Sequence, residues 1–145
     1  MSVDEFLLDH SPRLFRFLNG RLVTFSVRDI TDVFQACDSM FESYSKRVVF
    51  AGMDSSWLEV DPDCDLDSRT SSILVHDKTY DPRLWEIIYS LMTLDYIALL
   101  SMKPACVLYS HVDALKHFQD DIVNPRLVPT RVQSARDLIQ GLRDS

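Results

Sequence analysis

The segment 105–142, with the sequence ACVLYSHVDALKHFQDDIVNPRLVPTRVQSARDLIQGL, decides the fold class of this chain. Its first five residues are an apolar run typical of a strand, and Ser110 with Asp113 has the spacing of a helix N-cap. Apolar residues then recur at helical spacing as far as Asn124 and Pro125, a pair that predicts the end of this helix. Residues 126–129 form a second extended run.

A second helix is predicted to follow. Thr130 and Gln133 have the spacing of a capping box, in which side chains accept hydrogen bonds from free backbone N–H groups. The inner face of this helix comprises Val132, Ala135, Leu138, Ile139 and Leu142. Alternating strands and helices are typical of parallel strands covered by helices, so the chain is assigned to the α/β class.

The N-terminal part of the chain predicts a β-hairpin. Arg13 to Leu18 and Arg21 to Phe25 are two strand-like runs, and Asn19 with Gly20 joins them. Both turn residues tolerate the positive φ angles of a type I′ turn. The hairpin is therefore expected at one side of the sheet.

A helix and a buried strand are predicted next. Ser26 with Asp29 resembles another capping box, and the helix is expected to end between Glu42 and Ser45. Val48 to Ala51 is wholly apolar, which favours a central strand covered on both faces. Cys106 to Leu108 has the same character and the same expected position.

Residues 53–81 break this pattern and are interpreted as an acidic surface loop. Ser72 to His76 is a candidate edge strand within this segment. Asp81 with Pro82 then has the form of a helix N-cap and first turn. We predict a long buried helix over residues 83–102, with Tyr96 to Leu100 as an alternative strand.

Together these elements predict a single globular domain over residues 1–145. Its mixed sheet is expected to have four or five strands, with helices packed against it. One side of the predicted core comes from the long helix and the other from the first helix. The residues expected to meet there are Trp85, Ile88, Leu91, Met92, Phe34 and Phe41.

Composition and charge limit the classes of partner. The chain has 145 residues, 46% of them hydrophobic and 26% charged, which is typical of one ordinary globular domain. Its formal net charge of -7 disfavours binding to nucleic acid or to an anionic membrane. The same charge favours association with a protein that has a basic surface. Polar interruptions at Ser90, Thr93 and Asp95 argue against a membrane span in the long apolar segment.

The cysteines and the first residues favour a cytoplasmic protein. Cys37, Cys64 and Cys106 are an odd number without a Cys-x-x-Cys pair, as expected in a reducing compartment. Cys37 and Cys106 lie in apolar patterns and are expected to act as small hydrophobic residues. Cys64 lies between Asp63 and Asp65, whose carboxylates oppose thiolate formation. The acidic first five residues do not resemble a signal peptide.

The alternating aspartates at 61, 63, 65 and 67 suggest a metal site but fail its requirements. A calcium loop beginning at Asp61 needs glycine and glutamate where the chain has Leu66 and Ser72. The four histidines form no closely spaced ligand pair, so zinc is not favoured either. We therefore predict no metal and no cofactor.

Catalytic motifs are equally sparse. The three glycines lie far apart in the sequence, whereas a phosphate-binding loop needs several close together. An enzyme built on isolated side chains would have Asp81, His111 and Asp113 as candidates, although helix caps and turns explain these residues more simply. No catalytic residue is assigned.

The order of these elements resembles the STAS family, the fold of bacterial anti-sigma-factor antagonists. The resemblance covers Lys103 to Leu142 and extends to Leu14 to Phe50. Signalling members of that family carry an Asp-Ser-Ser-Gly segment with a serine that can be phosphorylated. The similar segment here is Asp54-Ser55-Ser56-Trp57, in which tryptophan replaces glycine. The resemblance implies possible phosphorylation at Ser55 or Ser56.

Two functional hypotheses follow. The first is a non-enzymatic, STAS-like interaction or regulatory module. The alternative is an immunity protein that neutralises a basic toxin or effector by covering its active site. Both would use a negatively charged surface to bind a basic protein, and the oligomeric state stays open. The residues expected to contact this partner are Glu59, Asp61, Asp63, Asp65 and Asp67.

Overall fold

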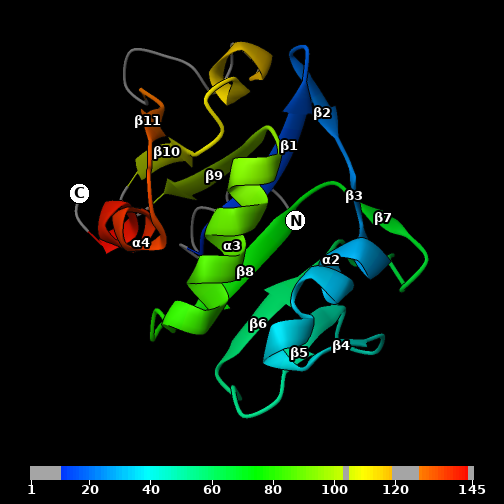
Figure 1. Ribbon diagram of the computed structural model, residues 1–145. Helices are drawn as coiled ribbons and strands as arrows, with labels where there is room; N and C mark the ends of the chain where they lie inside the picture. Colours follow the sequence, from blue (N-terminus) through cyan, green and yellow to red (C-terminus); the bar gives the residue numbers. More distant parts are fainter. Residues whose placement is uncertain (1–10, 103–104, 119–127, 144–145) are drawn as a thin grey trace.

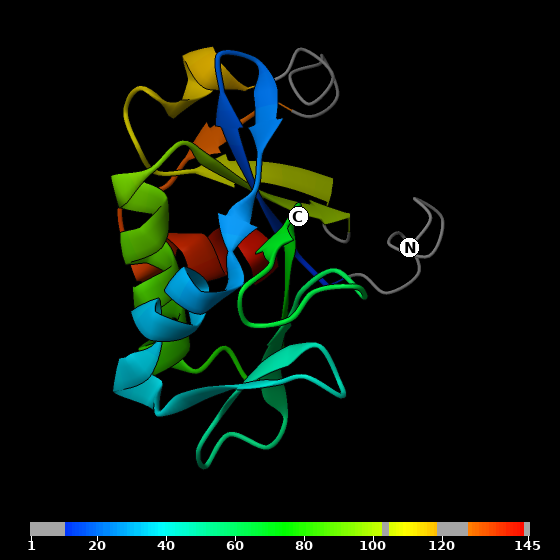
Figure 2. The same ribbon diagram turned by 90° about the vertical axis from the view of Figure 1, so that its right-hand side faces the viewer.

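The computed structural model describes residues 11–102, 105–118 and 128–143, and within them one large sheet carries helices on one face (Figures 1 and 2). The covering helices are α2 (Val27–Val33), α3 (Pro82–Leu94) and α4 (Ala135–Arg143). The described strands of this sheet are β1 (Arg13–Leu18), β2 (Arg21–Val23), β4 (Ser39–Glu42), β5 (Arg47–Phe50), β6 (Ser56–Glu59), β8 (Ile73–Asp77), β9 (Ile97–Met102), β10 (Ala105–Tyr109) and β11 (Thr130–Arg131).

The order of the strands is β11-β10-β9-β1-β8-β6-β5-β4, and β2 pairs with β1 alone. A second, small sheet joins β3 (Phe25–Ser26) to β7 (Arg69–Thr70). The predicted α/β class and the mixed sheet are confirmed. The predicted four or five strands are too few, because the large sheet has nine within the described residues. The expectation of mainly parallel strands is wrong, since β10 and β11 are the one parallel pair among the described strands.

The N-terminal hairpin forms as predicted. Asn19 and Gly20 both have positive φ, at 53° and 79°, and they connect β1 to β2. His117 holds the turn, because its Nδ1 accepts a hydrogen bond from the Asn19 N–H and its carbonyl accepts one from Gly20. The hairpin does not form one side of the sheet as predicted, because β1 pairs with both β8 and β9. Its turn projects beyond the end of the sheet (Figure 1).

The first helix starts where predicted but ends earlier. Ser26 is its N-cap and accepts a hydrogen bond from the Asp29 N–H at 3.2 Å. After Val33 the chain makes a short 3₁₀ helix, η1 (Gln35–Cys37), and Asp38 then adopts a left-handed conformation with φ 51°. The predicted continuation to residues 42–45 is wrong because β4 pairs with β5 there, which satisfies the backbone in an extended conformation instead.

The positions of three predicted strands need correction. Val48 to Ala51 and Cys106 to Leu108 were expected at the centre, but β5 and β10 each lie next to an edge strand. Along β5, Val48 and Phe50 are buried and Val49 is half-buried, which is the pattern of a strand covered on one face. Ser72 to His76 was expected at an edge, yet β8 lies inside the sheet between β6 and β1.

The segment 53–81 is not one loop, because it contains β6, β7 and β8. Asp61, Asp63, Asp65 and Asp67 lie in the connection between β6 and β7, and Glu59 is the last residue of β6. Asp81 caps α3 as predicted, with Pro82 in the first turn. The helix ends at Leu94, and the alternative strand is the observed one, as β9. The first three residues of β9 are fully buried, because side-chain clusters cover both faces of the sheet at this strand.

The C-terminal prediction is partly confirmed. Strand β10 forms over the predicted residues, but in the described part of the helix expected after Ser110, up to residue 118, the chain forms a 3₁₀ helix, η2 (Ala114–His117). The predicted helix end at residues 124–125 and the run from 126 lie outside the described residues, apart from 128 and 129. Thr130 belongs to β11 rather than to a cap, and Ser134 instead accepts a hydrogen bond from the Asp137 N–H at 3.0 Å before α4.

The predicted core is confirmed. Trp85, Ile88 and Met92 of α3 are buried in one cluster with Phe34, and Phe41 and Leu91 pack half-buried against it. This cluster lies between the helices and the sheet. A second cluster on the opposite face covers the β1–β9–β10 half, and it comprises Phe17, Ala98, Val107, Ala114 and Phe118.

Candidate functional site

The face of β4, β5, β6 and β8 that turns away from the helices carries a distinct set of side chains. Because side chains alternate along a strand, Leu58 and Val75 point to the core, and their neighbours point to this opposite face. None of the described helices covers it (Figure 2). We call this surface the open sheet face, and define it by Met40, Glu42, Arg47, Val49, Trp57, Glu59 and His76.

Trp57 is the centre of the open sheet face. Its ring stacks on His76 at 3.8 Å between centroids and 14° between planes, and the Arg47 guanidinium lies 4.1 Å from the indole centroid. Glu59 Oε1 accepts hydrogen bonds from Trp57 Nε1 at 3.0 Å and from Arg47 Nε at 3.2 Å. These contacts fix the tryptophan before any partner binds, which lowers the entropy cost of binding.

The free edge of the sheet adds exposed apolar side chains to this surface. Met40 on β4 is 58% exposed, and Tyr44 in the turn after β4 is 85% exposed. A hydrogen bond to Glu42 raises the pKa of the Tyr44 phenol. Tryptophan, tyrosine, methionine and arginine are the residues most enriched at protein–protein interfaces. The open sheet face therefore has the composition of a protein-binding surface.

The acidic segment, Glu59 to Asp67, does not form one cluster. Glu59 lies on the open sheet face, and Asp67 makes an exposed ion pair with Arg28 at the start of α2. Asp63 is exposed on the connection between β6 and β7.

The two remaining aspartates of this segment hold the loop together. Asp61 Oδ2 accepts hydrogen bonds from both the backbone and the hydroxyl of Ser71, each at 2.8 Å. Asp65 Oδ1 accepts from the Asp67 N–H and from the Ser68 hydroxyl. Across the part of the chain that the structure describes, no three acidic, histidine or cysteine side chains converge as a metal site would require.

The three weak catalytic candidates do not come together. Asp81 accepts hydrogen bonds from the backbone and guanidinium of Arg83, whose side chain lowers the pKa of this carboxyl group. It is the N-cap of α3, whereas His111 packs edge-on against Tyr96, which follows the C-terminal end of that helix. His111 Nδ1 accepts from the Asp113 N–H at 3.0 Å, so these two residues stabilise a local turn.

The two serines with a possible phosphorylation role differ in accessibility. Ser55 is exposed in the turn before β6. Ser56 is buried, and its hydroxyl donates to Asp77 Oδ1 at 2.9 Å. A phosphate on Ser56 would place negative charge beside a buried carboxylate, so Ser55 is the more accessible of the two positions.

The three cysteines behave as the sequence predicts. Burial is the main cause that raises the pKa of each thiol, and at Cys64 the carboxylates of Asp61 and Asp63 raise it further. Cys64 is buried and its thiol donates to the Arg69 carbonyl. At Cys37 the Arg83 guanidinium opposes the effect of burial on the pKa, but burial outweighs it, so none of these described thiols has the lowered pKa of a reactive cysteine.

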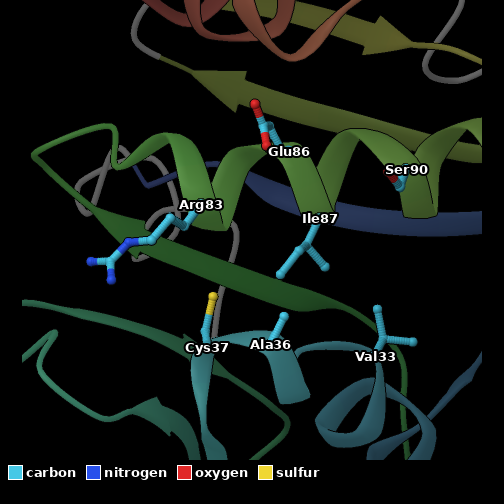
Figure 3. Close-up of a pocket in the computed structure, with 7 residues that line it drawn as sticks. All are labelled: Val33, Ala36, Cys37, Arg83, Glu86, Ile87 and Ser90. Atoms are coloured by element: carbon cyan, nitrogen blue, oxygen red, sulfur yellow. The ribbon is translucent and has the colours of Figure 1, made fainter.

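A groove lies on the helix side of the molecule, between α3 and the segment formed by α2 and η1. Figure 3 shows Ile87 of α3 directed toward Val33, Ala36 and Cys37 of the opposite wall. Its volume is about 510 Å³, and Arg83, Glu86 and Ser90 complete its lining. This groove and the open sheet face lie on opposite sides of the sheet.

Sequence reasoning missed Arg47, Trp57 and His76 as site residues. A signal was present at 56–59, where small or apolar residues alternate with Trp57 and Glu59. The sequence analysis placed a strand only at 72–76 and interpreted the rest of 53–81 as a loop, so the pairing of Trp57 with His76 was not predicted.

Searches against protein-family models, curated proteins and solved structures return no match to this chain. Over the described ranges, no helix is long and apolar enough to cross a membrane.

Proposed function

We propose that this chain is a non-enzymatic protein-interaction module that binds a partner through its open sheet face. The observation that carries the proposal is the stack of Arg47, Trp57 and His76, which is held rigid by Glu59 on a face that the described helices leave uncovered. A regulatory role of the STAS-like type is part of this proposal.

Charge defines the kind of partner. Residues 54–67 contain six acidic side chains and no basic one, and the whole chain has a formal net charge of -7. Glu59 joins this acidic segment to the open sheet face. A partner with basic side chains around an apolar patch would complement the acidic segment and the open sheet face at once. The negative electrostatic field of the chain would also speed the approach of such a partner.

Replacing Trp57 by alanine should abolish recovery of the partner. The variant loses the central aromatic ring and the contacts that order Arg47, and such residues dominate binding energies. The measurement is parallel affinity purification from the native host, followed by mass spectrometry. Val112→Ala is the matched control, because Val112 is exposed and lies between β10 and η2, away from the open sheet face.

A basic protein recovered with the wild-type chain and with Val112→Ala, but not with Trp57→Ala, would support the proposal. Equal recovery of every interacting protein with all three chains would overturn it. If the recovered partner is an enzyme whose activity is lost on stoichiometric binding, the immunity-type function is the correct one of the two hypotheses.

The acidic segment should control the rate of association. Changing Asp61, Asp63, Asp65 and Asp67 to asparagine should leave the free energy of unfolding within about 1 kcal/mol, because each side chain keeps an acceptor oxygen for its hydrogen bonds. The association rate should fall about tenfold at low salt and little at high salt.

Stopped-flow kinetics with the recovered partner provide the measurement. The matched control changes four acids elsewhere to asparagine, namely Asp32, Asp95, Asp113 and Asp137. Both variants alter the net charge equally. If the acidic segment contributes specifically, its variant should lower the association rate more than the control variant does. Equal rates in the two variants would show that only net charge matters.

A further inference from the structure

The groove between α2–η1 and α3 has an apolar floor that continues along α3. Val33 is 43% exposed at one wall, and Ile87 lies opposite it in the groove. Leu94 is 82% exposed and lies seven residues after Ile87, which places it on the same stripe of the helix. The groove therefore continues along α3 toward Leu94, with the exposed Ser90 between these two apolar residues.

The surroundings of this groove are acidic. Glu86 lines it, and Asp29 lies one turn before Val33 on the same side of α2. Asp38 ends η1 beside Cys37. Burial is the main cause that raises the pKa of the Cys37 thiol, Arg83 lowers it, and Asp81 and Asp38 raise it further. Among the described lining residues, Arg83 supplies the one positive charge.

Arg83 is already neutralised. Its guanidinium donates to both carboxylate oxygens of Asp81, at 3.1 Å from Nε and 2.8 Å from Nη2. Asp81 thus balances Arg83, and Glu86, Asp29 and Asp38 leave an excess of negative charge around the groove. An apolar floor with acidic edges is complementary to an amphipathic segment with basic edges.

We propose that this groove docks an amphipathic helix of a partner protein, with apolar side chains on the groove floor and lysine or arginine at its edges. The site goes beyond the proposed function, because it lies on the other side of the sheet and does not require the open sheet face. Helix-in-groove recognition uses apolar anchors spaced by helical turns, and Ile87 and Leu94, two turns apart on α3, offer apolar contacts for them.

The test uses a synthetic peptide of about 15 residues, the length at which an isolated helix begins to form. Leucines occupy one face of the peptide and lysines flank them. Binding is followed by fluorescence anisotropy and by the rate at which iodoacetamide alkylates Cys37. Cys106 in β10 serves as an internal reference because it lies outside the groove.

Saturating peptide should slow Cys37 alkylation about tenfold and leave Cys106 unchanged. Ala36→Arg should weaken peptide binding about tenfold, because it adds bulk and like charge to the groove. Val112→Arg is the matched control, since it adds the same charge at an exposed position elsewhere and should bind the peptide like the wild type. Trp57→Ala should also bind normally, which separates this site from the open sheet face.

Several results would overturn the assignment. These are no peptide binding, binding without protection of Cys37, or equal binding by Ala36→Arg. Equal binding of a peptide with glutamates in place of the lysines would contradict the basic edges. Protection of Cys37 that rises with protein concentration in the absence of peptide would assign the groove to a second copy of this chain instead.

Discussion

Replacing Asp77 by asparagine is expected to lower the free energy of unfolding by about 3 to 6 kcal/mol. Asp77 is 8% exposed, and five donors surround its carboxylate. Oδ1 accepts from the Ser56 hydroxyl and from the backbone and hydroxyl of Thr79. Oδ2 accepts from the Asp81 N–H at 2.9 Å and from Trp85 Nε1 at 2.8 Å.

An asparagine amide cannot reproduce this arrangement. An NH₂ group in place of Oδ2 faces the Asp81 N–H and the Trp85 Nε1–H, which can only donate. An NH₂ group in place of Oδ1 faces the Thr79 N–H, and the Ser56 and Thr79 hydroxyls must turn round to accept from it. A hydrogen bond to a charged group contributes about 1.5 to 3 kcal/mol, and domains have only about 5 to 15 kcal/mol of stability in total. The loss would therefore remove a large part of the stability of this fold.

Urea titration at neutral pH measures the effect, and Asp61→Asn is the matched control. Both hydrogen bonds to Asp61 reach a single oxygen, so the amide can keep them and the change should be about 1 kcal/mol or less. Similar losses of unfolding free energy in the two variants would show that the buried donors around Asp77 do not determine how much this residue contributes to stability.

Truncating Ile88 to alanine is expected to destabilise the protein by about 2 to 5 kcal/mol. Ile88 is fully buried on α3, in the cluster that joins the helix to Phe34 and to the strands. The truncation removes buried methyl and methylene groups, and well-packed neighbours fill the resulting cavity only in part.

Leu94→Ala is the control on the same helix. Leu94 is exposed, so its truncation should change the free energy of unfolding by about 0.5 kcal/mol at most. Denaturant titration compares the two variants under identical conditions. A loss below about 0.5 kcal/mol for Ile88→Ala would contradict the position of α3 over the core.

The parts of the fold that were predictable are those with local causes. The turn at Asn19 and Gly20 needs two residues that accept positive φ, and the start of α3 needs only Asp81 and Pro82. The periodicity that placed Ile88 in the core also lies within one helix. In each case the deciding atoms are close together in the sequence.

The errors concern elements whose conformation depends on distant partners. Met40 and Phe41 fit a helical spacing, but they form a strand because β5 is available to pair with them. Tyr96 to Leu100 is apolar enough for either a helix or a strand, and pairing with β1 and β10 decides the outcome. Strand order is a property of the whole sheet, so no local pattern predicts that β8 is internal.

The candidate site shows the same division. The sequence indicated that residues 59–67 are acidic, but it did not indicate that Asp61 and Asp65 hold their own loop. It also concealed the stack on Trp57, because Arg47 and His76 come from two other strands. Only the pairing of these strands brings the three side chains together.

The central position of β1 has a consequence for biosynthesis. One neighbour of β1 is β8 and the other is β9, so β1 pairs with strands that are synthesised much later than itself. Until residues 97–102 have emerged, the edge of β1 that faces β9 lacks the partner on which it closes in the folded protein. We therefore expect the nascent chain to carry an open, aggregation-prone edge until β9 has been synthesised.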